Sequence, residues 1–134
     1  MAAERESSNP ISVKLNGSNY SYWSYLMRNF LKGKKLWGYV SGILTQPTND
    51  RDPKYAELFD IWDVNNAKII TWINLAVETS IGIQLAKYDR AKDVWDHLAK
   101  VFTQSNFAKQ YQLEGYISVR FSKVIVVFKI FTLL

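Results

Sequence analysis

Asp93, Asp96 and His97 are the residues whose types and spacing come closest to a metal site. Zinc binds imidazole and carboxylate groups, and on a helix Asp93 lies one turn before His97. A zinc site needs more protein ligands than this group supplies, and the chain has one histidine and no cysteine. We therefore interpret His97 as a surface histidine and expect neither a metal ion nor another cofactor.

Arrangements that support catalysis are missing from the sequence as well. Serines and threonines are numerous, but no Gly-x-Ser-x-Gly motif presents one as a nucleophile, and no second histidine accompanies His97. The acids from Asp50 to Asp63 do not follow the spacing of an EF-hand, and the glycine of that calcium loop is absent. We predict a protein that is not an enzyme, has no catalytic residues and takes no small-molecule substrate.

The first third of the chain carries the best candidates for contact with nucleic acid. The chain has a net charge of +5, and no Asp or Glu occurs between Glu6 and Asp50. Basic side chains in such a stretch can bind phosphate groups without reading a base sequence. The candidate contacts are Arg28, Lys32, Lys34 and Lys35. The alternative is an ordinary solvated helix end, on which these charges bind no partner.

Apolar residues recur at helical spacing along most of the chain, which predicts an all-α bundle of about five or six helices. The first helix should cover residues 20–33, with Ser18 or Asn19 as its cap and Gly33 at its end. A short apolar turn that includes Trp37 should follow this helix.

Four later helices are expected. The first begins after Pro53, the second covers residues 80–87, the third covers 90–104, and the fourth ends at about residue 117. In the first of these, Leu58 shares the apolar face, and Asn65 and Asn66 indicate a bend. Asp89 should cap the helix over 90–104, because its side-chain oxygen can accept a free backbone N–H.

The tryptophans lie at the spacing of a core face rather than as a platform for base stacking. Proteins that bind single strands usually present aromatic side chains from strands and loops, next to cations. We predict one helical core that contains Trp23, Trp62, Trp72, Trp95, Leu98 and Phe102. Of the tyrosines at 20, 22 and 25, several must lie off the core face.

The first third of the chain resembles the N-terminal segment of Gag polyproteins from plant copia-type LTR retrotransposons. The similar stretch is KLNGSNYSYWSYLMRNFLKGKKLWGYVSG, residues 14–42, followed by Pro47. The family's pattern there is Leu-x-Gly-x-Asn-Tyr-x-x-Trp, then a Leu-rich helix, a Gly-aromatic turn and a proline. The residues that fit this pattern are Leu15, Gly17, Asn19, Tyr20, Trp23, Leu31, Gly38, Gly42 and Pro47.

A second stretch resembles the part of Gag that follows. It is WDVNNAKIITWINLAVETSIGIQLAKYDRAKDVWDHLAKVFTQSNFAKQYQLEGYI, in which Ala91, Trp95, Leu98 and Phe102 match the family's A-x-x-x-W-x-x-L-x-x-x-F helix. Together the two stretches cover about residues 13–117. The resemblance implies an α-helical, capsid-like Gag domain, whose role would be self-association into particles that package the RNA of the element.

The expected organisation has three parts: a disordered leader over 1–12, the helical Gag domain over 13–118, and an apolar tail over 119–134 that departs from the family. After residue 117 the chain departs from the family, and it lacks the cysteines of the zinc knuckle that comes later in Gag, so we interpret it as a truncated, degenerate or mis-joined copy. The tail includes VIVVF, residues 124–128, a run of high β-propensity. The tail would form either a final core element or an exposed strand prone to aggregation, and we favour the second.

The expected partners are further copies of the chain and weakly bound RNA, with no membrane. No signal peptide and no stretch long enough to span a bilayer is visible, and cysteine is absent, so we expect a cytoplasmic protein. The alternative function is a small basic nucleic-acid-binding module that assembles no particles.

Overall fold

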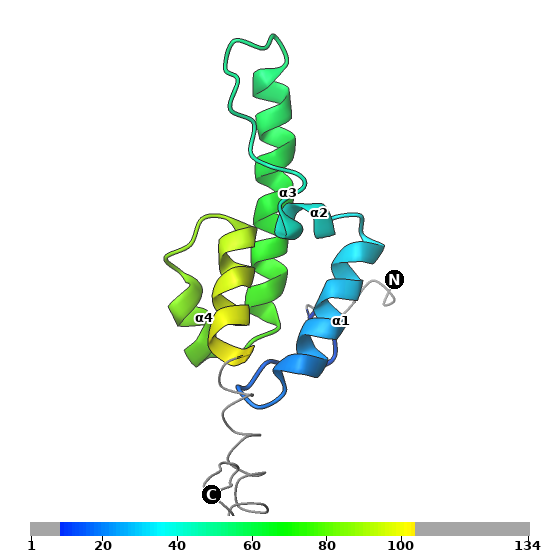
Figure 1. Ribbon diagram of the computed structural model, residues 1–134, viewed down its shortest axis with the longest axis vertical. Coiled ribbons are helices and arrows are strands. Elements are labelled where there is room, and N and C mark those ends of the chain that lie inside the picture. Colours follow the sequence, from blue (N-terminus) through cyan, green and yellow to red (C-terminus); the bar gives the residue numbers. More distant parts are fainter. Residues whose placement is uncertain (1–8, 104–134) are drawn as a thin grey trace, which may run out of the picture. The chain divides into compact units, whose positions relative to one another are not determined.

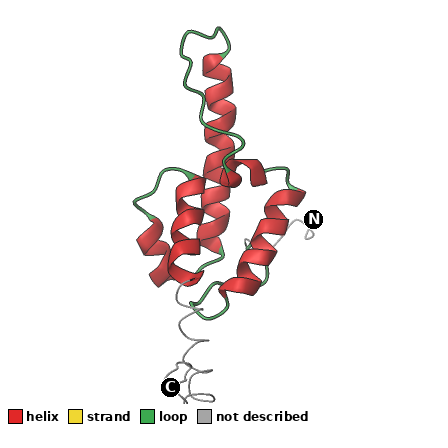
Figure 2. Ribbon diagram, viewed as in Figure 1, coloured by secondary structure: helices red, strands yellow, loops and turns green. Residues whose placement is uncertain are grey.

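The computed structural model describes residues 9–103 and builds this part from helices joined by loops, so the predicted all-α fold is confirmed (Figures 1 and 2). The labelled helices are α1 (Tyr20–Gly33), α2 (Trp37–Ser41), α3 (Tyr55–Leu75) and α4 (Thr79–Leu85). A further helix covers residues 91–103 and is called the 91–103 helix below. Most of the expected leader, the helix expected up to residue 117 and the tail over 119–134 lie outside the described residues.

Among the described residues, 9–98 belong to one compact unit and 99–103 to a second, and all sites described below lie in the first. In the first unit, α1, α4 and the start of the 91–103 helix surround the second half of α3 (Figure 1). The first half of α3 extends beyond the other helices of this unit and is accompanied by the loop over 43–54 (Figure 1). No helix formed by residues 9–103 is long and apolar enough to cross a membrane.

The end of α1 is set by its backbone hydrogen bonds. The N–H of Leu36 donates to the carbonyl of Leu31 at 2.8 Å, and the N–H of Lys35 donates to the carbonyl of Lys32 at 3.0 Å. This pair of bonds is a Schellman motif, which needs one residue in the left-handed conformation. Gly33 is the last helical residue, as predicted, but the left-handed residue is Lys35, with φ of 64°.

The helix α3 runs without interruption through Asn65 and Asn66, where the sequence had indicated a bend. The Oδ1 of Asn66 accepts the N–H of Ala91 at 2.7 Å, and its Nδ2 donates to the carbonyl of Asp89 at 2.8 Å. The Nδ2 of Asn65 donates to the hydroxyl of Tyr39 at 2.9 Å. Both amides therefore join α3 to its neighbours, and Asn66 rather than the Asp89 side chain caps the 91–103 helix.

Trp23 and Trp95 form the centre of the core. Their rings stack with centroids 5.7 Å apart, and the ring of Trp37 meets Trp95 edge-on at 5.2 Å. Trp23 is fully buried, and Trp95 and Leu98 are 8% and 1% exposed. Because these rings come from α1, α2 and the 91–103 helix, their packing holds three helices of the first unit together.

Two other tryptophans expected in this core are only half-buried. Trp72 is half-buried and its ring meets Phe30 edge-on, with centroids 4.9 Å apart. Trp62 is half-buried and lines a surface pocket. Leu58 is 42% exposed, because no other helix among the described residues covers the first half of α3. Phe102 belongs to the second unit.

Candidate functional site

Two residues of the Gag-like N-terminal pattern, Leu15 and Trp23, form hydrogen bonds with the turn that follows α3. Leu15 donates its N–H to the carbonyl of Ala76 at 2.9 Å and accepts the N–H of Glu78 at 3.0 Å, beside its β-bridge partner Val77. The indole Nε1–H of Trp23 donates to the same carbonyl of Ala76 at 2.7 Å. Leu15, Trp23 and Ala76 are fully buried, so this part of the pattern is structural.

Asn19 is the N-cap residue of α1, as expected, but its side chain makes no capping hydrogen bond and instead holds the loop before the helix closed. Its Nδ2 donates to the carbonyl of Lys14 at 3.0 Å, and its Oδ1 accepts the N–H of Asn16 at 3.1 Å. Between them, Gly17 takes a φ of 97°, which side chains larger than hydrogen adopt with strain. Tyr20 follows with its ring largely buried, and this burial raises the pKa of its hydroxyl.

The later residues of the pattern shape α2 and the loop after it. Gly42 ends α2 in the left-handed conformation, with φ of 98°. Gly38 lies under the side chain of Leu44, where an added Cβ would come within 2.9 Å of the Leu44 Cδ1. Pro47 is half-buried in the loop that leads to α3.

The four candidate phosphate contacts lie in the second half of α1 and just past its end. They are Arg28, Lys32, Lys34 and Lys35, and are called the basic end of α1 below. The lysines are exposed and Arg28 is half-buried. The Nζ of Lys34 lies 5.5 Å from the ring centre of Phe30 and 5.9 Å from that of Trp72, which indicates a cation–π contact. Cations also suit this position because the carboxyl end of a helix carries partial negative charge.

A pair of exposed tyrosines shares the solvent face of α1 with Lys32. Tyr22 and Tyr25 are 58% and 54% exposed, and their rings stack with centroids 6.5 Å apart. Spacings of three and seven residues place Tyr22, Tyr25 and Lys32 on one face of the helix. The sequence had already indicated that some of these tyrosines leave the core, and this face can offer aromatic surface beside a cation.

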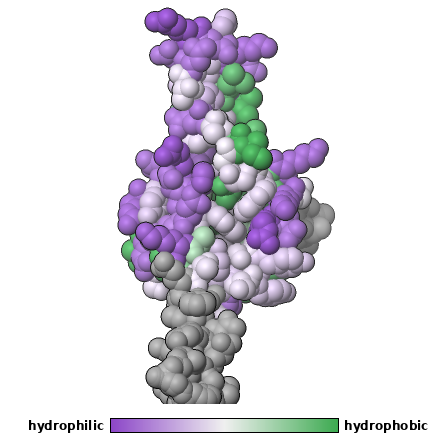
Figure 3. All heavy atoms as spheres, viewed as in Figure 1, coloured by the Kyte–Doolittle hydropathy of each residue, from purple (hydrophilic) through white to green (hydrophobic). Residues whose placement is uncertain are grey.

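The first half of α3 exposes a row of apolar side chains that periodicity alone did not identify. Leu58, Ile61 and Val64 are 42%, 49% and 47% exposed, and are called the apolar stripe below. Figure 3 shows hydrophobic surface along this end of the helix. Glu57 and Asp60 lie within a turn of the stripe and are exposed. An apolar face bordered by acids resembles a protein-binding surface more than a core face.

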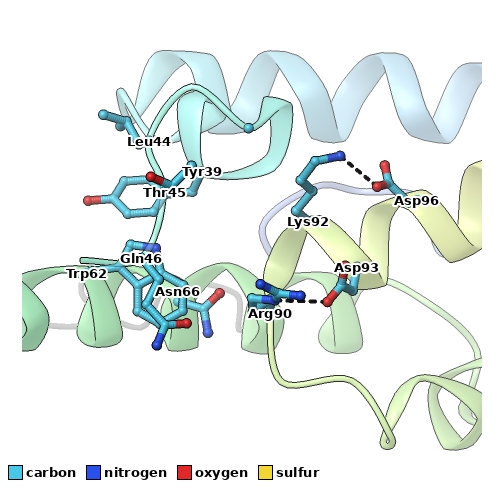
Figure 4. Close-up of a pocket in the computed structure, with 11 residues that line it drawn as sticks. Tyr39, Leu44, Thr45, Gln46, Trp62, Asn66, Arg90, Lys92, Asp93 and Asp96 are labelled. Atoms are coloured by element: carbon cyan, nitrogen blue, oxygen red, sulfur yellow. Dashed lines mark hydrogen bonds and ion pairs between the residues drawn. The ribbon is translucent and has the colours of Figure 1, made fainter. Parts of the chain in front are cut away.

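A pocket of about 320 Å³ lies between the loop after α2, the middle of α3 and the start of the 91–103 helix (Figure 4). Tyr39, Gln46 and Trp62 line one side of it, and Arg90 and Lys92 lie on the other (Figure 4). Both cations are paired, since Arg90 contacts Asp93 at 3.0 Å and Lys92 contacts Asp96 at 2.7 Å. The lining therefore consists of aromatic and amide side chains together with cations that are already paired with acids. Among the lining residues, no nucleophile lies beside a general base, so the pocket lacks an arrangement for catalysis.

The side chain of His97 contacts Tyr88. Its Nδ1 is 3.0 Å from the hydroxyl of Tyr88, and the side chain is half-buried rather than fully on the surface. Within residues 9–103, no cluster of three or more histidine, aspartate or glutamate side chains is arranged to hold a metal ion.

Two family models match the chain, and both describe the Gag-polypeptide of LTR copia-type elements. One covers residues 2–48 and the other residues 27–129. The second spans more than half of the chain, so the protein belongs to the copia-type Gag polypeptides. Its match continues past residue 118, the expected end of the Gag domain. No curated protein and no solved structure matches the chain.

Proposed function

We propose that this chain is a structural protein of a retrotransposon particle, which self-associates in the cytoplasm, packages RNA and catalyses no reaction. Its membership of the copia-type Gag family over residues 27–129 carries this proposal. The exposed apolar stripe on α3 supports a role in protein contacts. The basic end of α1, in a stretch without acids, supports a role in RNA contacts.

The mass of the full chain in solution tests self-association. Size-exclusion chromatography with light scattering, on protein freed of RNA by nuclease and high salt, should give masses that rise above the 15.6 kDa monomer as concentration increases. The rise should be reversible on dilution, which separates assembly from irreversible aggregation. A mass of 15.6 kDa at every concentration up to about 100 μM would contradict the proposal, because even contacts of micromolar affinity populate dimers there.

A nucleic-acid-binding module without assembly is the second candidate function. The stacked, exposed Tyr22 and Tyr25 beside Lys32 favour it, because bases stack on aromatic rings next to cations. Binding should be weak and independent of base sequence, because contacts from basic side chains to phosphate groups carry no sequence information.

Fluorescence anisotropy with labelled single-stranded RNA of several sequences tests this candidate. Lys34→Glu with Lys35→Glu should weaken binding equally for every sequence and make the affinity less dependent on salt. The matched control is Lys14→Glu with Lys68→Glu, which reverses two exposed charges elsewhere in the same unit. Equal affinities for both double variants would exclude the basic end of α1 as an RNA site.

A further inference from the structure

The apolar stripe and the basic end of α1 have complementary charge. From Asp50 to Asp63, the loop and the first half of α3 contain five acids against two bases. The basic end of α1 contains four cations, and α1 contains no acid. Among residues 9–103, ion pairs join only Arg90 with Asp93 and Lys92 with Asp96. The two surfaces are therefore not neutralised by each other within one copy.

The basic end of α1 also offers apolar surface to a partner. Phe30 and Trp72 are both half-buried and meet edge-on beneath the ammonium group of Lys34. An interface commonly places aromatic residues at its centre and charged residues around them. This surface thus has apolar area for the stripe and cations for the acids that border it.

Contact between two apolar stripes is disfavoured by the same charges. If two copies met stripe to stripe, Glu57 and Asp60 of both copies would lie in one interface. Like charges placed across an interface suppress such pairing, whereas opposite charges favour it. The better occupant for the stripe is therefore the basic end of α1 on another copy.

We propose that copies of this chain associate head to tail, with the apolar stripe of one copy against the basic end of α1 of the next. This inference rests on the proposed self-association and names the surfaces that carry it. Each contact leaves one stripe and one basic end unused at the two ends of the assembly. A contact of this heterologous type generates a ring if it closes and a growing chain if it does not.

Two complementary double variants of the full chain test the inference. Asp60→Lys with Ile61→Ser disables the stripe, and Lys32→Glu with Lys35→Glu disables the basic end of α1. For each variant alone, the dissociation constant of self-association should be at least about tenfold higher than for the unmodified chain. Their equimolar mixture should form a one-to-one complex and nothing larger, because it contains one intact stripe and one intact basic end per pair. Light scattering on nuclease-treated protein measures all three masses.

Matched controls separate this contact from a general effect of charge or folding. Glu78→Lys with Ile83→Ser repeats the first pair of changes at an exposed acid and an exposed isoleucine elsewhere in the unit. Lys14→Glu with Lys68→Glu repeats the second. Both controls should associate like the unmodified chain, and all variants should keep its far-ultraviolet circular dichroism.

Several results would overturn the head-to-tail contact while self-association stands. One is a mixture of the two variants that stays monomeric. Another is a basic-end variant that assembles normally and loses only RNA binding, which would assign that surface to RNA. A third is a loss of assembly in the controls as well. If the unmodified chain is monomeric, the proposed self-association itself fails, and the head-to-tail contact fails with it.

Discussion

Replacement of Asn66 by alanine should destabilise the first unit more than the replacement of any exposed asparagine on the same helix. The Asn66 side chain is 6% exposed and joins α3 to the start of the 91–103 helix by two hydrogen bonds. Alanine at this position leaves the N–H of the buried Ala91 and the carbonyl of Asp89 without their partner. The lost interaction lies between helices, so helix propensity cannot replace it.

The magnitude follows from these two bonds. A hydrogen bond contributes about 1 kcal/mol net, and a buried group left unsatisfied costs about 1–3 kcal/mol. Alanine has a higher helix propensity than asparagine, and this difference offsets at most about 0.7 kcal/mol of the lost stability. We therefore expect Asn66→Ala to lower the free energy of unfolding by about 2–3 kcal/mol. For a domain of this size, that corresponds to a fall in Tm of roughly 8 °C or more.

Thermal and urea unfolding, followed by circular dichroism, measures this loss. The matched control is Asn74→Ala, because Asn74 is exposed and its Nδ2 donates only to the carbonyl of Ile70 on its own helix. This control should change stability by less than about 0.5 kcal/mol, as surface substitutions usually do. Hydrogen exchange should also speed up selectively at the first amides of the 91–103 helix. Equal stability of the two variants would refute the role assigned to Asn66.

Three further outcomes can be checked with the same unfolding and yield measurements. Trp95→Ala should cost about 3–5 kcal/mol, because it removes the ring that stacks on Trp23; a loss below about 1 kcal/mol would contradict this core. Lys35→Gly should raise stability by about 0.5–1 kcal/mol by relieving the left-handed conformation, while Lys35→Ala should bring no gain. Deletion of residues 119–134 should raise the soluble yield, because it removes the apolar run over 124–128, and a lower Tm after deletion would instead assign the tail to the fold.

Much of α1 could be predicted because its signals are local. The apolar spacing along residues 20–33 indicates a helix from neighbouring residues alone. Its C-terminal turn could not be predicted, since Lys35 takes a conformation that glycine usually provides. The lysines at 32, 34 and 35 are exposed, because several cations at a helix end cannot all be buried unpaired.

The sequence by itself determined the helical class, the approximate helix ranges and the separation of basic and acidic segments, since each depends on neighbouring residues along the chain. Only the tertiary structure decided which apolar faces are covered. Trp95 is buried between Trp23 and Trp37, whereas Leu58, with equally regular spacing, is left exposed where no described helix packs on α3. Likewise Asn66 caps a helix that begins 25 positions later. Periodicity reports the apolar side of a helix, but a neighbour brought there by the fold decides whether that side becomes core or surface.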